Sequence, residues 1–241
     1  MRPTLTLILL ACMLQACGPL RQMQKVQSQI PQLGSIGEHR SSLFEKDFQK
    51  VGEPILERPI SVSLQSIPFS GNLKSRYEKY RVHMGRPPLA TTMDSVQLKN
   101  LSYYRAEIND LVDLVGELNQ DYNSNLSSYL QEDKELVLLS SISFRGDNVL
   151  SGKLDSAERL YLTTDRSGTM VLRIGGGIHD GFSIKQSDLE VFDFQKANFC
   201  WDKDNKGRSR IAHILMDGGS CPGETEKDPK KLDKTPDYLK P

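Results

Sequence analysis

The residues with the clearest capacity for chemistry lie in a glycine-rich segment, residues 175–181, with the sequence GGGIHDG. A histidine next to a carboxylate can act as a general base with its orienting partner, which makes His179 and Asp180 candidate ligand-binding residues. Clustered glycines can also cradle a phosphate where they join a strand to a helix N-terminus. Here, however, Phe182–Ile184 continues as a strand-like sequence, and adjacent residues of an extended chain point apart. We therefore favour a turn or bulge between two strands and keep His179 and Asp180 as a secondary hypothesis.

A second segment, residues 202–207 (DKDNKG), has the opening pattern of a calcium-binding EF-hand loop. Asp202 and Asp204 occupy positions one and three, and Gly207 occupies position six. Position five is Lys206, which cannot donate an oxygen ligand, and position twelve is His213, where a bidentate glutamate is required. We favour a polar hairpin turn and predict no metal site.

The sequence contains no motif for nucleophilic or metal-dependent hydrolysis. Neither Gly-x-Ser-x-Gly nor His-Glu-x-x-His occurs, and the histidines are scattered singly, at His39, His83, His179 and His213. We therefore predict no catalytic residue and no cofactor, although a site that assembles only in three dimensions stays open.

The N-terminal residues have the composition of an export signal. Met1 and Arg2 form a small positive region, and residues 5–14 are an apolar run. At about ten residues, this run is well short of the roughly 20 that a helix needs to cross a bilayer. Cys17 follows the apolar run, with Leu14 three residues before it and Ala16 directly before it.

This arrangement resembles the lipobox of bacterial lipoproteins, with Gln15 departing from the pattern. The resemblance implies that residues 1–16 are a signal peptide and that Cys17 becomes the lipidated first residue of the mature chain. Gly18 after the cysteine implies outer-membrane anchoring in a host with two membranes. The alternatives are ordinary secretory cleavage after Ala16 and a leader retained as a buried helix.

The remaining cysteines agree with an exported protein. If Cys12 leaves with the leader and Cys17 carries lipid, Cys200 and Cys221 are an even pair in an oxidising compartment, where a disulfide is favoured over free thiols. Two isolated cysteines lack the paired spacing that zinc ligands usually show.

The charge composition limits the classes of partner. The chain has 31 basic and 31 acidic residues, so no basic surplus points to nucleic acid. We expect the membrane, reached through lipidated Cys17, and an envelope protein or glycan as partners. The oligomeric state stays open.

Composition and periodicity divide the chain into five segments. After the leader, residues 1–16, we expect a lipid-anchored flexible tether at 17–50 and a mainly helical region at 51–134. An antiparallel β region with the disulfide follows at 135–221, and 222–241 form a disordered charged tail with little to bury.

The helical region is expected to contain one long amphipathic helix. Its apolar positions are spaced by threes and fours, at Leu101, Tyr104, Ile108, Leu111, Val115, Leu118 and Tyr122. A shorter helix is expected at 73–83. Residues 60–64 alternate as a strand, and the prolines around them favour an edge or isolated strand.

The β region shows a two-fold period. Strands are expected at 136–144, 160–164, 169–174, 191–194, 199–201 and 210–216, with hairpin turns at 165–168 and 205–207. The predicted fold class is α+β, a long amphipathic helix followed by an antiparallel sheet, sandwich or partial barrel.

These observations favour a non-enzymatic envelope lipoprotein with a structural, scaffolding or binding role. The alternative is a ligand-binding or hydrolytic β-domain acting on envelope carbohydrate or peptide through His179, Asp180 or Asp202. Self-association through the face from Leu101 to Tyr122 is a third hypothesis.

Overall fold

The computed structural model describes residues 30–41, 46–92, 95–96, 100–175, 181–216 and 218–232. The chain divides into two compact units, residues 1–30 and 31–241, and the account below concerns the second. The leader at 1–16, Cys17, the tether as far as residue 29, His179, Asp180 and residues 233–241 all lie outside the described residues.

The described elements follow one another in this order: β1 (Ile36–Ser41), β2 (Lys46–Gly52), β3 (Ile60–Pro68), α3 (Gly71–His83), α4 (Leu89–Thr92), β4 (Ser102–Ile108), α6 (Leu111–Leu118), η1 (Asp121–Asn123), α7 (Ser124–Glu132), β5 (Leu136–Arg145), α8 (Asn148–Asp155), β6 (Leu160–Thr164), β7 (Met170–Ile174), β8 (Phe182–Lys185), η2 (Gln186–Asp188), β9 (Glu190–Lys203), β10 (Ser209–Met216) and η3 (Pro229–Leu232).

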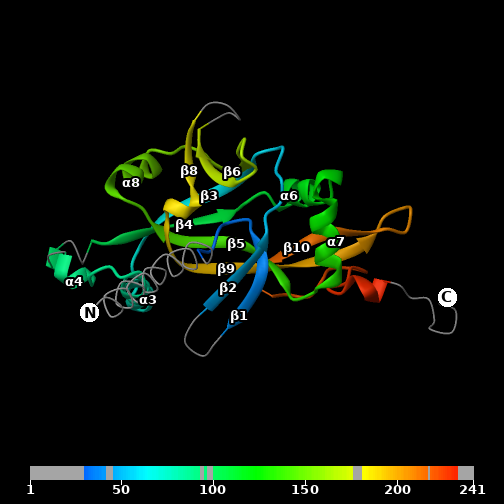
Figure 1. The fold of residues 1–241 in the computed structure, drawn as a ribbon, viewed down its shortest axis with the longest axis horizontal. Helices are drawn as coiled ribbons and strands as arrows, with labels where there is room; N and C mark the ends of the chain where they lie inside the picture. Colours follow the sequence, from blue (N-terminus) through cyan, green and yellow to red (C-terminus); the bar gives the residue numbers. More distant parts are fainter. Residues whose placement is uncertain are drawn as a thin grey trace, which may run out of the picture. The chain divides into compact units, whose positions relative to one another are not determined.

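The strands form an antiparallel sheet in the order β10-β9-β5-β4-β3-β6-β7-β8, and Figure 1 shows this sheet curling into a half-barrel. β5 is the central strand, with β9 along one side. Its other side is shared by β1, which pairs with Leu136–Leu138, and β4, which pairs with Ser141–Phe144. Both faces of β5 are covered, so nearly all of its side chains are buried. The expected antiparallel β architecture with additional helices is confirmed.

The long amphipathic helix expected from Leu101 to Tyr122 is wrong. Residues 102–108 are strand β4, and only Leu111–Leu118 form a helix, α6. β4 lies between β3 and β5 and buries both Tyr103 and Tyr104, which point to opposite faces. A two-fold period is present, since Tyr104, Ala106 and Ile108 are buried and alternate with half-buried Arg105 and Glu107. The helical spacing arises because Tyr104 and Ile108 lie in line with the threes and fours that continue through α6. Asp110 separates the two elements and accepts a hydrogen bond from the Asp113 N–H, as a helix N-cap does.

The expected tether is shorter than its predicted span of 17–50. Leu33 and Ile36 are fully buried, and residues from 36 onward form β1 and β2. The Leu33 N–H donates to the Gln186 side chain, and the Gln186 amide donates back to the Leu33 carbonyl. Gly34 has φ +82°, and a Cβ there would lie 2.5 Å from Leu162 Cδ2. Glycine is therefore required at this close approach.

The shorter elements agree better with the sequence. α3 covers the helix expected at 73–83, and β6 and β7 form the expected hairpin. The two strands expected at 191–194 and 199–201 are one continuous strand, β9, and β10 returns antiparallel to it. The region expected to be mainly helical, 51–134, also contains strands β3 and β4.

The first part of the expected disordered tail is ordered. Cys200 and Cys221 form the predicted disulfide, with their Cα atoms 5.6 Å apart. Beyond it, Trp201 and Glu226 exchange two backbone hydrogen bonds of 2.8 and 3.0 Å. β5 does not extend far enough to pair with this end of β9, so residues around Glu226 satisfy backbone groups that would otherwise lack a partner.

Within the part of the chain that the structure describes, no helix combines the length and the apolar character needed to cross a membrane.

Candidate functional site

The residues that the sequence singled out do not come together in one site. His179 and Asp180 lie outside the described residues, but the strands on either side, β7 and β8, pair antiparallel. The glycine-rich segment therefore joins two strands of a hairpin, as favoured, and does not lead into a helix N-terminus. The flanking Gly175 and Gly181 have φ of +127° and +143°, conformations that glycine tolerates best.

The segment with the EF-hand pattern is a hairpin turn between β9 and β10. The Asp204 carboxylate accepts hydrogen bonds from the Lys206 and Arg208 N–H groups and from Arg208 Nε. These contacts, led by the Arg208 N–H, hold the pKa of Asp204 below its usual value. No group of three or more His, Cys, Asp or Glu side chains in the described ranges is arranged to hold a metal ion.

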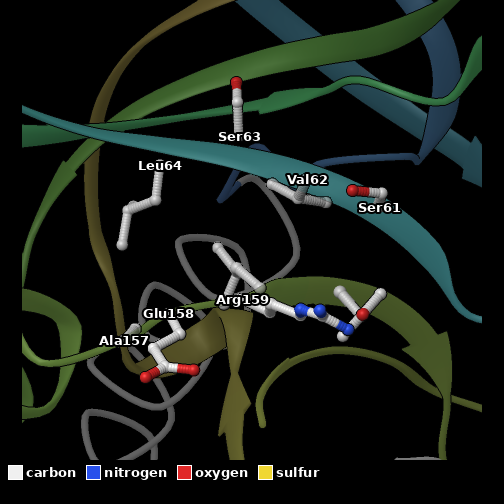
Figure 2. Close-up of a pocket in the computed structure, with 9 residues that line it drawn as sticks. Ser61, Val62, Ser63, Leu64, Ala157, Glu158 and Arg159 are labelled. Atoms are coloured by element: carbon white, nitrogen blue, oxygen red, sulfur yellow. The ribbon is translucent and has the colours of Figure 1, made fainter. Parts of the chain in front are cut away.

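A cavity lies where the sheet splits between β3 and β6, a place that the sequence did not indicate. β6 pairs with β3 only along Ile60–Val62. Beyond Val62 the two chains separate and enclose a cavity of about 540 Å³, lined by Ser61–Leu64 and by residues 157–161. Figure 2 shows Leu64 pointing into this cavity and Ser63 pointing away from it.

β3 presents an unpaired backbone edge to the cavity. On its other side β3 pairs with β4 along its whole course from Val62 to Pro68. The Ser61 carbonyl accepts from Asn109 N–H, so the odd-numbered residues direct their backbone groups toward β4. In an antiparallel ladder these directions alternate, so the N–H and C=O groups of Leu64 and Ser66 face the cavity side.

Pro68 also fits this geometry. Its missing N–H falls on the cavity side, where no strand of the described chain pairs with β3. The prediction of an edge strand for 60–64 is therefore wrong at Val62, which pairs with both β4 and β6, whereas residues 63–68 pair only with β4 and do form an edge. The prolines were the sequence signal that could have located it.

The wall opposite β3 is held in place by hydrogen bonds. It follows α8, whose first turn is capped by Asp147 through the Leu150 N–H. The Tyr104 hydroxyl donates to Asp155 at the end of α8, and the Gly175 N–H donates to the Arg159 carbonyl. The cavity is therefore bounded by positioned backbone on both sides.

The lining offers backbone groups, several apolar side chains, Leu64 among them, and two charges of opposite sign. Glu158 and Arg159 are both exposed and lie on the wall opposite β3, as Figure 2 shows. The lining residues, all of which are described, include serine and tyrosine hydroxyls but no histidine or cysteine. This combination suits the binding of an extended chain, since it supplies a strand edge and a place for alternate side chains.

A buried carboxylate, Glu117, forms a second polar centre away from the cavity. It accepts from the Glu57 and Arg58 N–H groups at 2.7 and 3.2 Å, from Arg58 Nε at 2.7 Å and from the Tyr122 hydroxyl at 2.7 Å. Burial favours a raised pKa for Glu117, but these hydrogen bonds outweigh it and hold the pKa below its usual value. Burial and the bond to Glu117 raise the pKa of Tyr122 to about 12.

The hydrogen bonds around Glu117 have a structural role and do not form a reactive site. The donors to Glu117 come from the loop before β3 and from η1, and Glu117 itself belongs to α6, so the carboxylate ties these three segments together. With donors on both oxygens, the carboxylate has little capacity left for a ligand. Sequence analysis missed it because Glu117 falls on the polar face of the helix that was expected there.

Compared with protein families, with curated proteins and with solved structures, this chain matches none of them.

Proposed function

We propose that this protein is a lipid-anchored lipoprotein of the bacterial cell envelope that binds an extended polypeptide segment of an envelope partner by strand addition to β3. The anchor is Cys17, supported by the resemblance of residues 14–17 to a lipobox. The disulfide between Cys200 and Cys221 is consistent with an oxidising compartment. Outer-membrane anchoring is part of the proposal and rests on Gly18.

The observation that carries the binding role is the open edge of β3. Leu64 directs one donor and one acceptor toward a cavity of about 540 Å³, and Ser66, beyond the cavity lining, directs the same two groups to the same unpaired side of β3. A peptide strand that pairs there makes main-chain hydrogen bonds, each contributing about 0.5–1.5 kcal/mol net. Such a small number of bonds gives modest affinity, so contacts of the peptide side chains with Leu64, Glu158 and Arg159 must supply the rest and the specificity.

Anchoring compensates for modest affinity. A protein held at the membrane meets envelope partners at a raised effective concentration, so the β3 edge can still be occupied by a peptide that binds it weakly. This is why a binding or scaffolding role fits the fold without any catalytic group.

A proline substitution tests the proposed strand addition. Ser66→Pro removes an N–H from the unpaired side of β3, two residues beyond Leu64, and leaves the β3–β4 ladder intact, whereas Ser66→Ala keeps that N–H and serves as the matched control. A photo-crosslinking side chain placed at Glu158 in cells should form adducts with a partner, and Ser66→Pro should reduce them roughly fivefold. Adducts that persist in Ser66→Pro, or that are lost equally in Ser66→Ala, would contradict the proposal.

A further inference from the structure

Helix α3 and its continuation carry a concentration of positive charge that the neutral composition of the chain conceals. Residues 71–92 contain five Lys or Arg residues and one acidic residue, in a chain with equal numbers of both. The basic residues are Lys74, Arg76, Lys79, Arg81 and Arg86. α3 packs on the sheet through Tyr77, which is buried against Tyr103 and Phe192, with Leu73 and Tyr80 partly buried beside it. The other side of the helix, with Lys79 and Val82, is exposed, and Lys74 is half-buried.

Part of this charge is compensated and part is not. Arg76 pairs with Asp193 at 2.6 Å, and Arg86 pairs with Glu190. Arg81 donates to the Pro87 carbonyl, which carries no net charge. Lys74 and Lys79 have no carboxylate partner within the described ranges.

An exposed apolar side chain lies beside the free lysine charge. Val82 is 60% exposed and stands three residues after Lys79, so the two are neighbours on the helix surface. Pro87 and Pro88, which follow the helix, are also exposed. Flexible lysine side chains next to small exposed apolar groups suit the headgroup region of a lipid bilayer. There the lysines can contact dispersed anionic headgroups while the apolar groups lie near the hydrocarbon.

We infer that the outer surface of α3, formed by Lys74, Lys79 and Val82, binds anionic phospholipid headgroups as a second attachment of the body to its membrane. The inference rests on the proposed lipid anchor, which brings the surface within reach of a membrane. No more than about 55 Å of fully extended chain separates Cys17 from Leu33, the first buried residue of the part that the structure describes. Positive charge near an anionic leaflet is attracted over a Debye length, so α3 is drawn to the surface once the anchor is inserted.

Lipid is favoured over other anionic partners by this proximity and by the surface itself. Nucleic-acid recognition combines basic residues with hydrogen-bonding groups or stacking platforms for bases. On α3 the tyrosines are turned inward, since Tyr77 is buried and stacks on Phe69 and Tyr80. The outer surface offers charge and a valine instead. A second attachment would fix which face of the body is turned to the membrane.

Vesicle binding of a lipid-free protein tests this inference separately from the anchor. The mature full-length chain with Cys17→Ser is mixed with phosphatidylcholine vesicles with and without phosphatidylglycerol, and the bound fraction is measured by co-sedimentation. Binding is expected only with phosphatidylglycerol and should fall at high salt. Lys74→Glu with Lys79→Glu should weaken binding by at least roughly tenfold.

The matched control reverses the same amount of charge elsewhere. Lys203→Glu with Lys206→Glu changes two exposed lysines at the β9–β10 turn and should leave vesicle binding unchanged. Melting temperatures establish that both variants fold. The inference is overturned by equal binding to phosphatidylcholine alone, by equal loss in the control, or by binding to a DNA duplex without binding to vesicles. None of these outcomes bears on whether Cys17 carries lipid, so failure here is distinct from failure of the proposed anchor.

Discussion

At the scale of single residues, the most consequential side chain is Glu117. It is 1% exposed, yet it is ionised and satisfied by donors from two other segments, the loop before β3 and η1. Removing one partner of a buried charge pair leaves the other group uncompensated, so the stability of the fold is sensitive to substitution at this site. Asn123 reinforces it by donating to the Glu117 carbonyl and by bonding both backbone groups of Ile55.

Glu117→Gln is expected to lower the free energy of unfolding by about 2–4 kcal/mol at neutral pH, because a neutral amide accepts these hydrogen bonds less strongly. The native pKa of Glu117 is depressed, so its carboxylate contributes stability above the unfolded pKa of about 4.3. That contribution is lost as the pH falls through the lower native value.

The free energy of unfolding, measured with denaturant at neutral pH and at about pH 3, checks this prediction. Wild type should lose more stability than Glu117→Gln between the two conditions, and Glu224→Gln, at an exposed position, should behave as wild type. Identical acid dependence in Glu117→Gln and wild type would contradict it.

At the scale of elements, the sheet depends on how its edges are closed. β10 is an edge strand, and Asn119 at the end of α6 covers part of it. The Asn119 side chain donates to the Ile211 carbonyl at 2.8 Å and accepts from the Ile211 N–H at 3.0 Å, as a neighbouring strand would. A bulge between Ile211 and His213 adds to this protection.

Asn119→Ala should therefore lower stability by about 1–2 kcal/mol and expose the β10 edge to pairing with a second chain. Chemical denaturation measures the first effect, and sedimentation at rising protein concentration measures the second. Gln120→Ala is the control, since the Gln120 side chain bonds the Gly116 carbonyl of its own helix. Unchanged stability with monomeric behaviour in Asn119→Ala would show that the edge is closed by other means.

Secondary-structure elements were predictable from the sequence where the turn residues and the apolar period agree on one element. The hairpin of β6 and β7 was found because its turn residues and its alternation agree. β4 was taken for a helix because Tyr104 and Ile108 continue the spacing of the apolar residues of α6. The prolines around 60–64 indicated an edge strand, but not where the edge begins, because it begins where β6 stops pairing with β3, and strand pairing is a property of the sheet and not of either strand.

At the scale of the whole molecule, segments at both ends of the described chain are recruited into the sheet. Leu33–Ile36 are buried near one end, and residues around Glu226 bond to β9 near the other. Composition indicated neither segment as part of the fold, because a polar, proline-containing sequence can still pair through its backbone where a strand has a free side. The disulfide holds the second segment in place, and on the chain-entropy model it stabilises the fold by about 3 kcal/mol.

The proposed role joins this sheet to a membrane through one residue, so the most direct measurement is mass spectrometry of the native protein's N-terminal peptide. The account predicts a chain that begins at Cys17, with diacylglycerol in thioether linkage to its sulfur. A retained leader, or an unmodified thiol at Cys17, would contradict it.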